Sequence, residues 1–221
     1  MLRYLITVLA ALLSSIGGVH SADFRFSQVE QEERAQQAQQ QSGQQVRIAD
    51  LLNTPCAKAI KNNKILVLFG EYQNGVVRAG QTRFNPYFDV INSRLRSLGL
   101  RTYTQAQIKQ QVAQAEIDAY FRNDPDAALN ASRRLAARYI LKGLISTETR
   151  FNPAINVNQV AVRMNFNLSD ANGKLISQAD AENASYSGPD TTGMTLTLIN
   201  ERADEVVASL YADHCKKSGI R

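Results

Sequence analysis

Two cysteines and a neighbouring histidine are the residues of this chain best suited to chemistry. Cys56 lies near the start of the segment expected to fold, and Cys215 lies near its end. In an oxidising compartment two cysteines usually pair, and a loop of this length would stabilise the fold by roughly 5 kcal/mol in the chain-entropy model. Two buried free thiols are the alternative. His214 and Cys215 could also form a nucleophile pair, but sequence neighbours rarely have the geometry and no helper acid is evident.

Other patterns typical of catalysis are weak. The segment from Gly70 to Gly75 has two glycines after an apolar run but lacks the Lys-Ser/Thr that grips phosphate in a P-loop. Asp124 and Asp126 supply two carboxylates, of which the first is explained as a helix cap. A zinc site needs several His or Cys ligands at close spacing, and these are missing. The sequence predicts no enzymatic activity, no cofactor and no metal site, with a hydrolase of unrecognised site as the alternative.

The pentapeptide Thr-Arg-Phe-Asn-Pro occurs twice, at 82–86 and 149–153. Each copy follows an expected core strand, so both copies would lie at one end of the sheet if those strands are neighbours. Arg and Phe are favoured interface anchors. We predict a partner-binding surface bordered by Arg83, Phe84, Arg150 and Phe151. The alternative is that Phe84 is a core residue and that Asn85-Pro86 only starts a helix.

The first 22 residues have the order of a secretory signal peptide. Arg3 precedes an apolar run from Tyr4 to Ile16, and small residues precede Ala22. The apolar run is shorter than the roughly 20 residues that span a bilayer, and no cysteine near the cleavage point could carry a lipid. We expect residues 1–22 to be removed, which leaves a soluble periplasmic protein without membrane insertion. An uncleaved membrane anchor is the alternative.

The remaining chain is mildly basic and starts with a segment rich in Gln. The net charge of +5 includes Arg3, so +4 remains after cleavage. The basic residues are scattered and no basic face is interleaved with aromatic residues, so nucleic-acid binding is not predicted. Residues 23–45 contain few apolar residues and are expected to form a flexible or loosely helical arm. Residues 46–221 are expected to form one domain.

Hydrophobic periodicity predicts the elements that would position these residues. Short apolar runs or period-two alternation predict strands at 64–69, 100–103, 139–145, 157–168 and 174–186. Apolar stripes at helical spacing, together with capping residues, predict helices at 84–98, 108–119, 125–137 and 196–210. The order β-α-β-α-α-β-β-β-α predicts an α+β fold in which helices pack against a single mixed sheet.

Three stretches carry a resemblance to a known family. They are KILVLFGEY at 64–72, ARYILKGLIST at 137–147 and VAVRMNFNLSDANGKLISQA at 160–179. They resemble the periplasmic α/β domain shared by CsgG-like proteins, LpoB-like activators of penicillin-binding proteins and the TolB amino-terminal domain. The resemblance implies this fold and a bacterial envelope setting. It does not carry over the CsgG channel, because the chain has no spare pair of membrane-spanning hairpins, and it identifies no residues that would activate a cell-wall synthase.

These features predict an accessory or adaptor protein that binds protein components of an envelope secretion, appendage-assembly or cell-wall machine. The alternatives are an envelope hydrolase and a small-molecule binder with a pocket at the strand exits. The segment 157–168 has the polar residues Arg163, Asn165 and Asn167 on one face, and it could recruit an added strand as a sheet edge or lie inside the sheet. Self-assembly into a homo-oligomeric ring is a further alternative that the CsgG resemblance implies.

Overall fold

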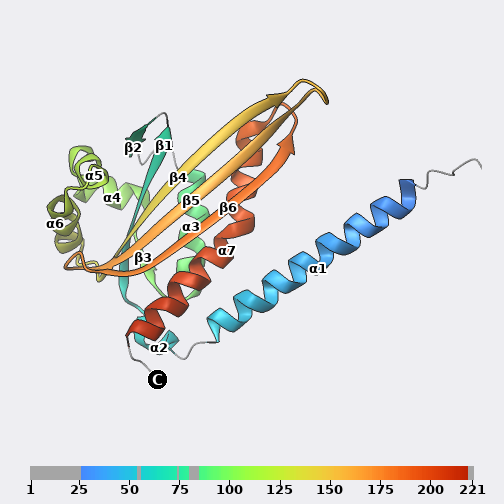
Figure 1. Ribbon diagram of the computed structural model, residues 1–221. Helices are drawn as coiled ribbons and strands as arrows, with labels where there is room; N and C mark the ends of the chain where they lie inside the picture. The colour runs from blue at the N-terminus through green and yellow to red at the C-terminus, as the bar shows by residue number, and fades with distance from the viewer. Residues whose placement is uncertain (1–25, 54–55, 74, 80–84, 219–221) are drawn as a thin grey trace, which may run out of the picture. The chain divides into compact units, whose positions relative to one another are not determined.

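The computed structural model describes residues 26–53, 56–73, 75–79 and 85–218 (Figure 1). The chain divides into two units, Met1–Ser42 and Gly43–Arg221. Helix α1 (Phe26–Leu52) runs across that division, so the Gln-rich segment is helical. Gln, Ala, Glu and Arg are all good helix formers, which explains a helix in a segment with few apolar residues. The predicted signal peptide lies outside the described residues, and its cleavage stays a prediction.

One mixed sheet organises the second unit. Its strands are β1 (Lys64–Gln73), β2 (Val76–Arg78), β3 (Arg101–Thr102), β4 (Tyr139–Asn152), β5 (Val157–Asp170) and β6 (Leu175–Ser187). The order is β2-β1-β4-β5-β6, and β3 also pairs with β1. The pairs β1–β4 and β1–β3 are parallel, whereas β1–β2, β4–β5 and β5–β6 are antiparallel. This arrangement confirms the predicted α+β fold class.

The helices follow the predicted order with one correction. They are α2 (Ala57–Ile60), α3 (Asn85–Ser97), α4 (Gln105–Gln111), α5 (Gln114–Phe121), α6 (Pro125–Leu135) and α7 (Thr191–Lys217). The single helix predicted over 108–119 is wrong, because the backbone is extended at Val112 and Ala113. The Glu116 carboxylate accepts a hydrogen bond from the Ala113 N–H (3.0 Å) and thereby starts a new helix.

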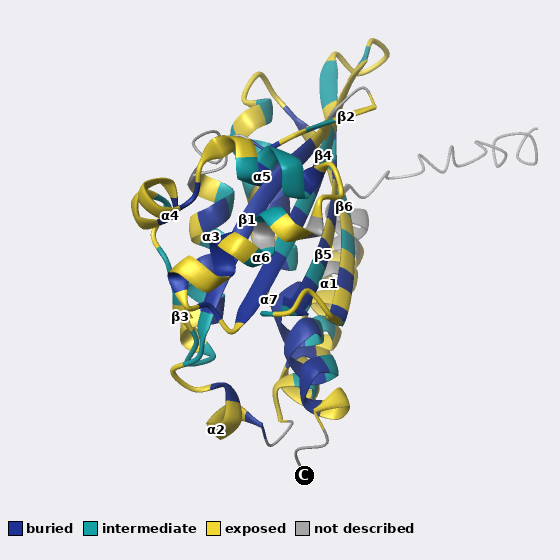
Figure 2. Cartoon of the chain, turned by 90° about the vertical axis from the view of Figure 1, so that its left-hand side faces the viewer, coloured by how far each residue is buried: buried dark blue, intermediate teal, exposed yellow. Residues whose placement is uncertain are grey.

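The two faces of the sheet differ in what covers them (Figure 2). One face packs against α3 and α7 and holds the aromatic core, where the Phe69 ring lies 6.3 Å from Phe88 and 5.9 Å from Phe166, both edge-on. The other face is covered over β1 by α5, whose Phe121 lies against Gly70. Farther across β5 and β6 this second face is polar, and we call that region the open face.

The open face explains the alternating pattern of β5. Its polar residues pair with β6 through Arg163–Glu182 (3.2 Å), Asn165–Asp180 (2.6 Å) and Gln178–Asn167 (2.9 Å). Because β5 is paired with β4 on one side and β6 on the other, the hypothesis that 157–168 is a sheet edge is wrong. In a sheet covered on one face only, apolar and polar residues alternate along the inner strands as they do along the edge strands. The alternation therefore does not distinguish an inner strand from an edge strand.

Candidate functional site

The parallel pairing of β1 and β4 sets the position of the second pentapeptide. The register joins Ile65–Glu71 to Tyr139–Ile145, so the two strands are neighbours. This is the condition under which both pentapeptides would lie at one end of the sheet. Strand β4 continues past Ile145 to Asn152 and pairs there with β5. Figure 1 shows the β4–β5 hairpin, in yellow and orange, extending beyond the end of β1. The second pentapeptide therefore lies at the far end of this hairpin.

The end of this hairpin, residues 150–156, is called the hairpin tip. Phe151 and Ile155 are 59% and 55% exposed there. The turn is held locally: Asn152 Oδ1 accepts a hydrogen bond from the Ala154 N–H at 3.0 Å, and Asn156 adopts a left-handed conformation with φ of 53°. The hairpin tip therefore presents apolar side chains on an ordered turn.

Arg150 adds a positive charge to the hairpin tip. Its Nε lies 2.6 Å from Glu148 Oε1, and both side chains are well exposed. An exposed ion pair of this kind contributes little to stability, with a median of about 0–1 kcal/mol. A carboxylate of a partner protein could therefore replace Glu148 as the ion-pair partner of Arg150 with little loss of free energy.

The four predicted partner-binding residues have different outcomes. Arg150 and Phe151 are consecutive residues of β4 at the hairpin tip, with side chains on opposite faces of the strand, whereas Arg83 and Phe84 fall outside the described residues. The prediction that both pentapeptides form one surface stays a prediction. Asn85 is the first residue of α3. The Asn85-Pro86 of the first pentapeptide thus starts a helix, as the alternative interpretation expected.

Sequence reasoning missed two exposed apolar residues near this surface. Ile155 lies in the turn itself. Tyr186, 56% exposed, is paired with Gln159, which is in turn paired with Arg150 of the hairpin tip. An apolar residue within a turn segment was the available signal for Ile155, because turns are usually polar. Tyr186 gave no such signal, since aromatic residues are common in strands.

A pocket of about 290 Å³ lies where β1 and β4 meet the start of α7. Its hydrogen-bonding groups come from Glu71, Tyr87, Thr147, Thr149, Thr191, Thr192 and Thr195. Thr147 Oγ1 donates to Glu71 Oε1 at 3.3 Å. Glycoside hydrolysis in most families needs two carboxyl groups at a set separation, and this lining supplies one. The pocket suits hydrogen bonding to a polar molecule, as the small-molecule alternative requires.

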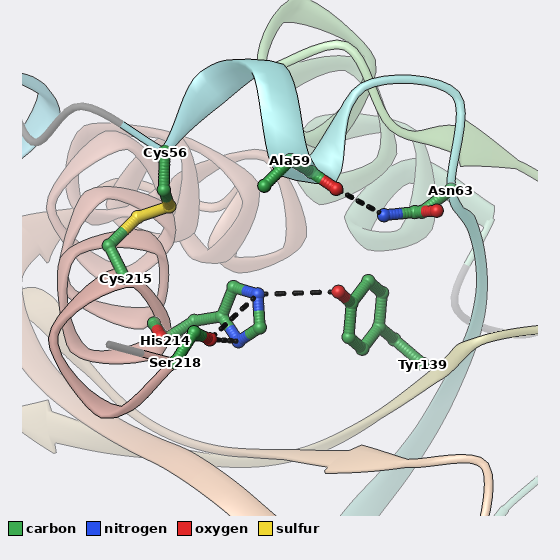
Figure 3. Close-up of a disulfide and its surroundings, with 7 residues drawn as sticks. All are labelled: Cys56, Ala59, Asn63, Tyr139, His214, Cys215 and Ser218. Carbon is green, nitrogen blue, oxygen red and sulfur yellow. Dashed lines mark hydrogen bonds between the residues drawn. A yellow bond between two sulfur atoms is a disulfide. The ribbon is translucent and has the colours of Figure 1, made fainter. Parts of the chain in front are cut away.

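The disulfide joins the two ends of the domain (Figure 3). Cys56 and Cys215 are bonded, with their Cα atoms 5.6 Å apart, as the sequence predicted. Both are buried in a small cluster with Ile60 and Tyr211, which connects α2 to α7. Because the sulfur of Cys215 is bonded to Cys56, it is not a thiolate nucleophile, and the hypothetical His214–Cys215 pair is excluded.

His214 is a buried residue beside the disulfide. Its Nε2 lies 3.3 Å from the Tyr139 hydroxyl oxygen, and the two rings meet edge-on at 5.2 Å (Figure 3). Burial lowers the pKa of His214, and the nearby charge of Arg138 lowers it further. The environment therefore favours neutral imidazole within the folded domain.

We expect the free energy of unfolding to fall as the pH drops from about 7.5 to about 5. The unfolded chain takes up a proton on His214 near the ordinary pKa of about 6.5, whereas the folded domain resists it. Chemical denaturation at several pH values measures this slope, and His214→Gln should flatten it. His20 lies in the predicted signal peptide and carboxyl groups titrate at lower pH. An equal slope in the variant would contradict this assignment.

The described residues contain neither a metal-binding cluster nor a membrane-spanning helix. No group of three or more His, Cys, Asp and Glu side chains there could hold a metal ion. Within the same residues no helix has the length and apolar character needed to cross a membrane.

Comparisons with known proteins show distant structural similarity. No family model and no curated protein matches the chain. Lipoprotein GNA1162 from Neisseria meningitidis is 15% identical over 66% of this chain and 99% of its own, with a TM-score of 0.45. PelC from Paraburkholderia phytofirmans, solved as a dodecamer, is 17% identical over 68% and 88%, with a TM-score of 0.41. The LpoB C-terminal domain from Salmonella enterica is 17% identical over 62% and 91%, with a TM-score of 0.39.

The LpoB part of the resemblance thus has a counterpart among these three structures, whereas the CsgG and TolB parts have none among them. Identities and scores at this level do not transfer a function to this chain.

Proposed function

We propose that the chain is a periplasmic accessory protein that binds another envelope protein through the hairpin tip. The observation that carries this proposal is the exposure of Phe151 and Ile155 on an ordered turn beyond the end of β1. Exposed apolar side chains that occur together, rather than singly, mark interaction sites. Arg150, the residue before Phe151 in β4, adds to the hairpin tip the residue type that is enriched, with aromatics, among binding hot spots.

The hairpin tip suits binding because little of it has to be ordered on contact. Strands β4 and β5 are paired up to Asn152 and Val157, and the turn between them is held by the Asn152 side chain. A preorganised loop loses less conformational entropy on association than a mobile one. An aromatic and a branched aliphatic side chain can then gain contacts in a partner pocket without refolding of the domain.

The disulfide supports the periplasmic setting. Disulfides persist in oxidising compartments and are rare in the cytosol, and the two cysteines of this chain are both in the Cys56–Cys215 bond. The signal-peptide pattern of residues 1–22 points to the same compartment. The partner is expected to be a protein of an envelope secretion, appendage-assembly or cell-wall machine.

Substituting Phe151 and Ile155 together by alanine should reduce recovery of the envelope partner by more than about tenfold. Hot-spot truncations lose about 2 kcal/mol or more each, and 1.4 kcal/mol is a factor of ten in affinity. The measurement is quantitative mass spectrometry of proteins crosslinked to, and purified with, each variant. The matched control is Val46→Ala with Val76→Ala, which truncates two other exposed apolar residues of the same unit.

Equal recovery with the tip variant and the control variant would contradict the proposal. Sedimentation of the purified protein adds a second readout. A monomer agrees with an accessory protein, whereas a ring that the tip variant abolishes would show that the hairpin tip binds other copies of this chain.

A further inference from the structure

A second pocket, of about 260 Å³, lies at the other end of β4 from the hairpin tip. It borders the open face where β4, β5 and the start of β6 meet the end of α5. The lining side chains on which its chemistry depends are Lys142, Asn167, Ser169, Leu175, Tyr120 and Asn123. All of them are described residues, and none is acidic.

Lys142 places an uncompensated positive charge in this pocket. Its Nζ lies 4.9 Å and 5.1 Å from the ring centroids of Tyr120 and Phe121 and donates to the Tyr120 carbonyl at 3.4 Å. Within the described part of the chain, no carboxylate forms an ion pair with it. Lys142 is partly buried, and this burial lowers its pKa because loss of water disfavours the charged form. A desolvated cation is usually paired, so the pocket lacks the negative charge that would complement it.

The polar groups around Lys142 include several hydrogen-bond donors. Asn167 Oδ1 already accepts from Gln178 Nε2 at 2.9 Å, which leaves the Asn167 amide N–H groups as its uncommitted polar atoms. The Lys142 ammonium has three N–H donors, of which the Tyr120 carbonyl takes one. Asn123 contributes a second side-chain amide at the rim. Several donors around one cation, without an acidic side chain, match the requirement of an oxyanion.

The remaining wall is apolar. Leu175, which is half exposed, and the Tyr120 ring flank the polar groups. A ligand with a charged oxyanion group and a small apolar part would thus meet both kinds of surface, as is usual for small-molecule sites.

We propose that this pocket binds a small oxyanion, a carboxylate or phosphate group, with Lys142 as the counter-charge and the Asn167 amide as a donor. The site is independent of the hairpin tip, because the two lie at opposite ends of β4. Failure of one proposal therefore leaves the other standing.

The test is a titration of the purified protein with inorganic phosphate and, separately, with acetate, each at constant ionic strength set by chloride. Side-chain amide signals of Asn167 and Asn123 are followed by NMR. We expect saturable shifts with at least one probe and an affinity at least about tenfold lower in Lys142→Met, because a charge-assisted hydrogen bond is lost. Lys109→Met, which removes an exposed lysine of α4, should bind like the unmodified protein.

The two probes separate the sources of the oxyanion. Saturation by phosphate alone assigns a phosphate group, and saturation by acetate alone assigns a carboxylate. If Lys142→Met does not fold, Asn167→Ala carries the same prediction and leaves the contacts of Lys142 in place. Shifts that do not saturate with either probe, or an affinity that is unchanged in both variants, would overturn the proposal.

Discussion

Replacing Cys56 and Cys215 together by alanine is expected to lower the free energy of unfolding by roughly 5 kcal/mol. The bond closes a loop with a sequence separation of 159 residues, and the chain-entropy model gives about that value for a loop of this length. A further contribution acts in the same direction. Both cysteines are buried with Ile60 and Tyr211, so alanine also removes packed atoms from the contact between α2 and α7.

Urea denaturation of the variant and of the oxidised protein measures this loss. A reductant should reproduce most of the loss in the unmodified protein and should change nothing in the variant, which serves as the matched control. A stability difference below about 1 kcal/mol would contradict the role given to the bond, since native disulfides typically contribute about 2–5 kcal/mol.

Phe166→Ala is expected to destabilise the domain by about 3–5 kcal/mol, the range for truncation of a buried phenylalanine. Phe166 is fully buried on the helix-covered face and meets Phe69 edge-on at 5.9 Å. The site cannot easily collapse, because Gly143 opposite Phe166 has no side chain to fill the space. A Cβ built at Gly143 would come within 2.7 Å of the Phe166 ring and 2.8 Å of the Phe69 ring.

Phe151→Ala is the matched control, because it removes the same ring from an exposed position in β4. Its effect on the free energy of unfolding should stay within about 0.5 kcal/mol. Comparable losses in the two variants would mean that the ring of Phe166 does not lie in the core that orders β4, β5 and β6.

Much of the fold could be predicted from local patterns. The apolar run 139–145 and the alternation along 157–168 predicted β4 and β5. A continuous apolar run reflects burial of both faces of a strand, and alternation reflects burial of one face. The disulfide could be predicted because the chain has two cysteines and a signal-peptide pattern. These features depend on neighbours along the chain or on simple counting.

Most of the missed features depend on contacts between residues far apart in the sequence. The break between α4 and α5 requires the Glu116 carboxylate, which caps α5 and is held 2.5 Å from Arg134 of α6. Strand order is not contained in periodicity, so β5 could be mistaken for an edge. The Lys142 pocket combines residues of α5, β4, β5 and β6 with the turn at Asn123, and no spacing in the sequence indicates such a set.

The hairpin tip was predicted in part for a similar reason. The repeated pentapeptide drew attention to Arg150 and Phe151, while Ile155 joined them because the turn brings it next to the end of β4. Residue types favoured at interfaces can be recognised in a sequence. Their exposure decides whether they are available to a partner. It arises because β4 continues past the last residue that pairs with β1.

Site-specific photo-crosslinking in intact cells tests the central claim most directly. A photoreactive phenylalanine analogue is placed at position 151 in one strain and at position 109, on the exposed surface of α4, in another. The account predicts a covalent adduct between position 151 and a different envelope protein, with no such adduct from position 109. No adduct from position 151, the same adduct from both positions, or an adduct only with a second copy of this chain would contradict it.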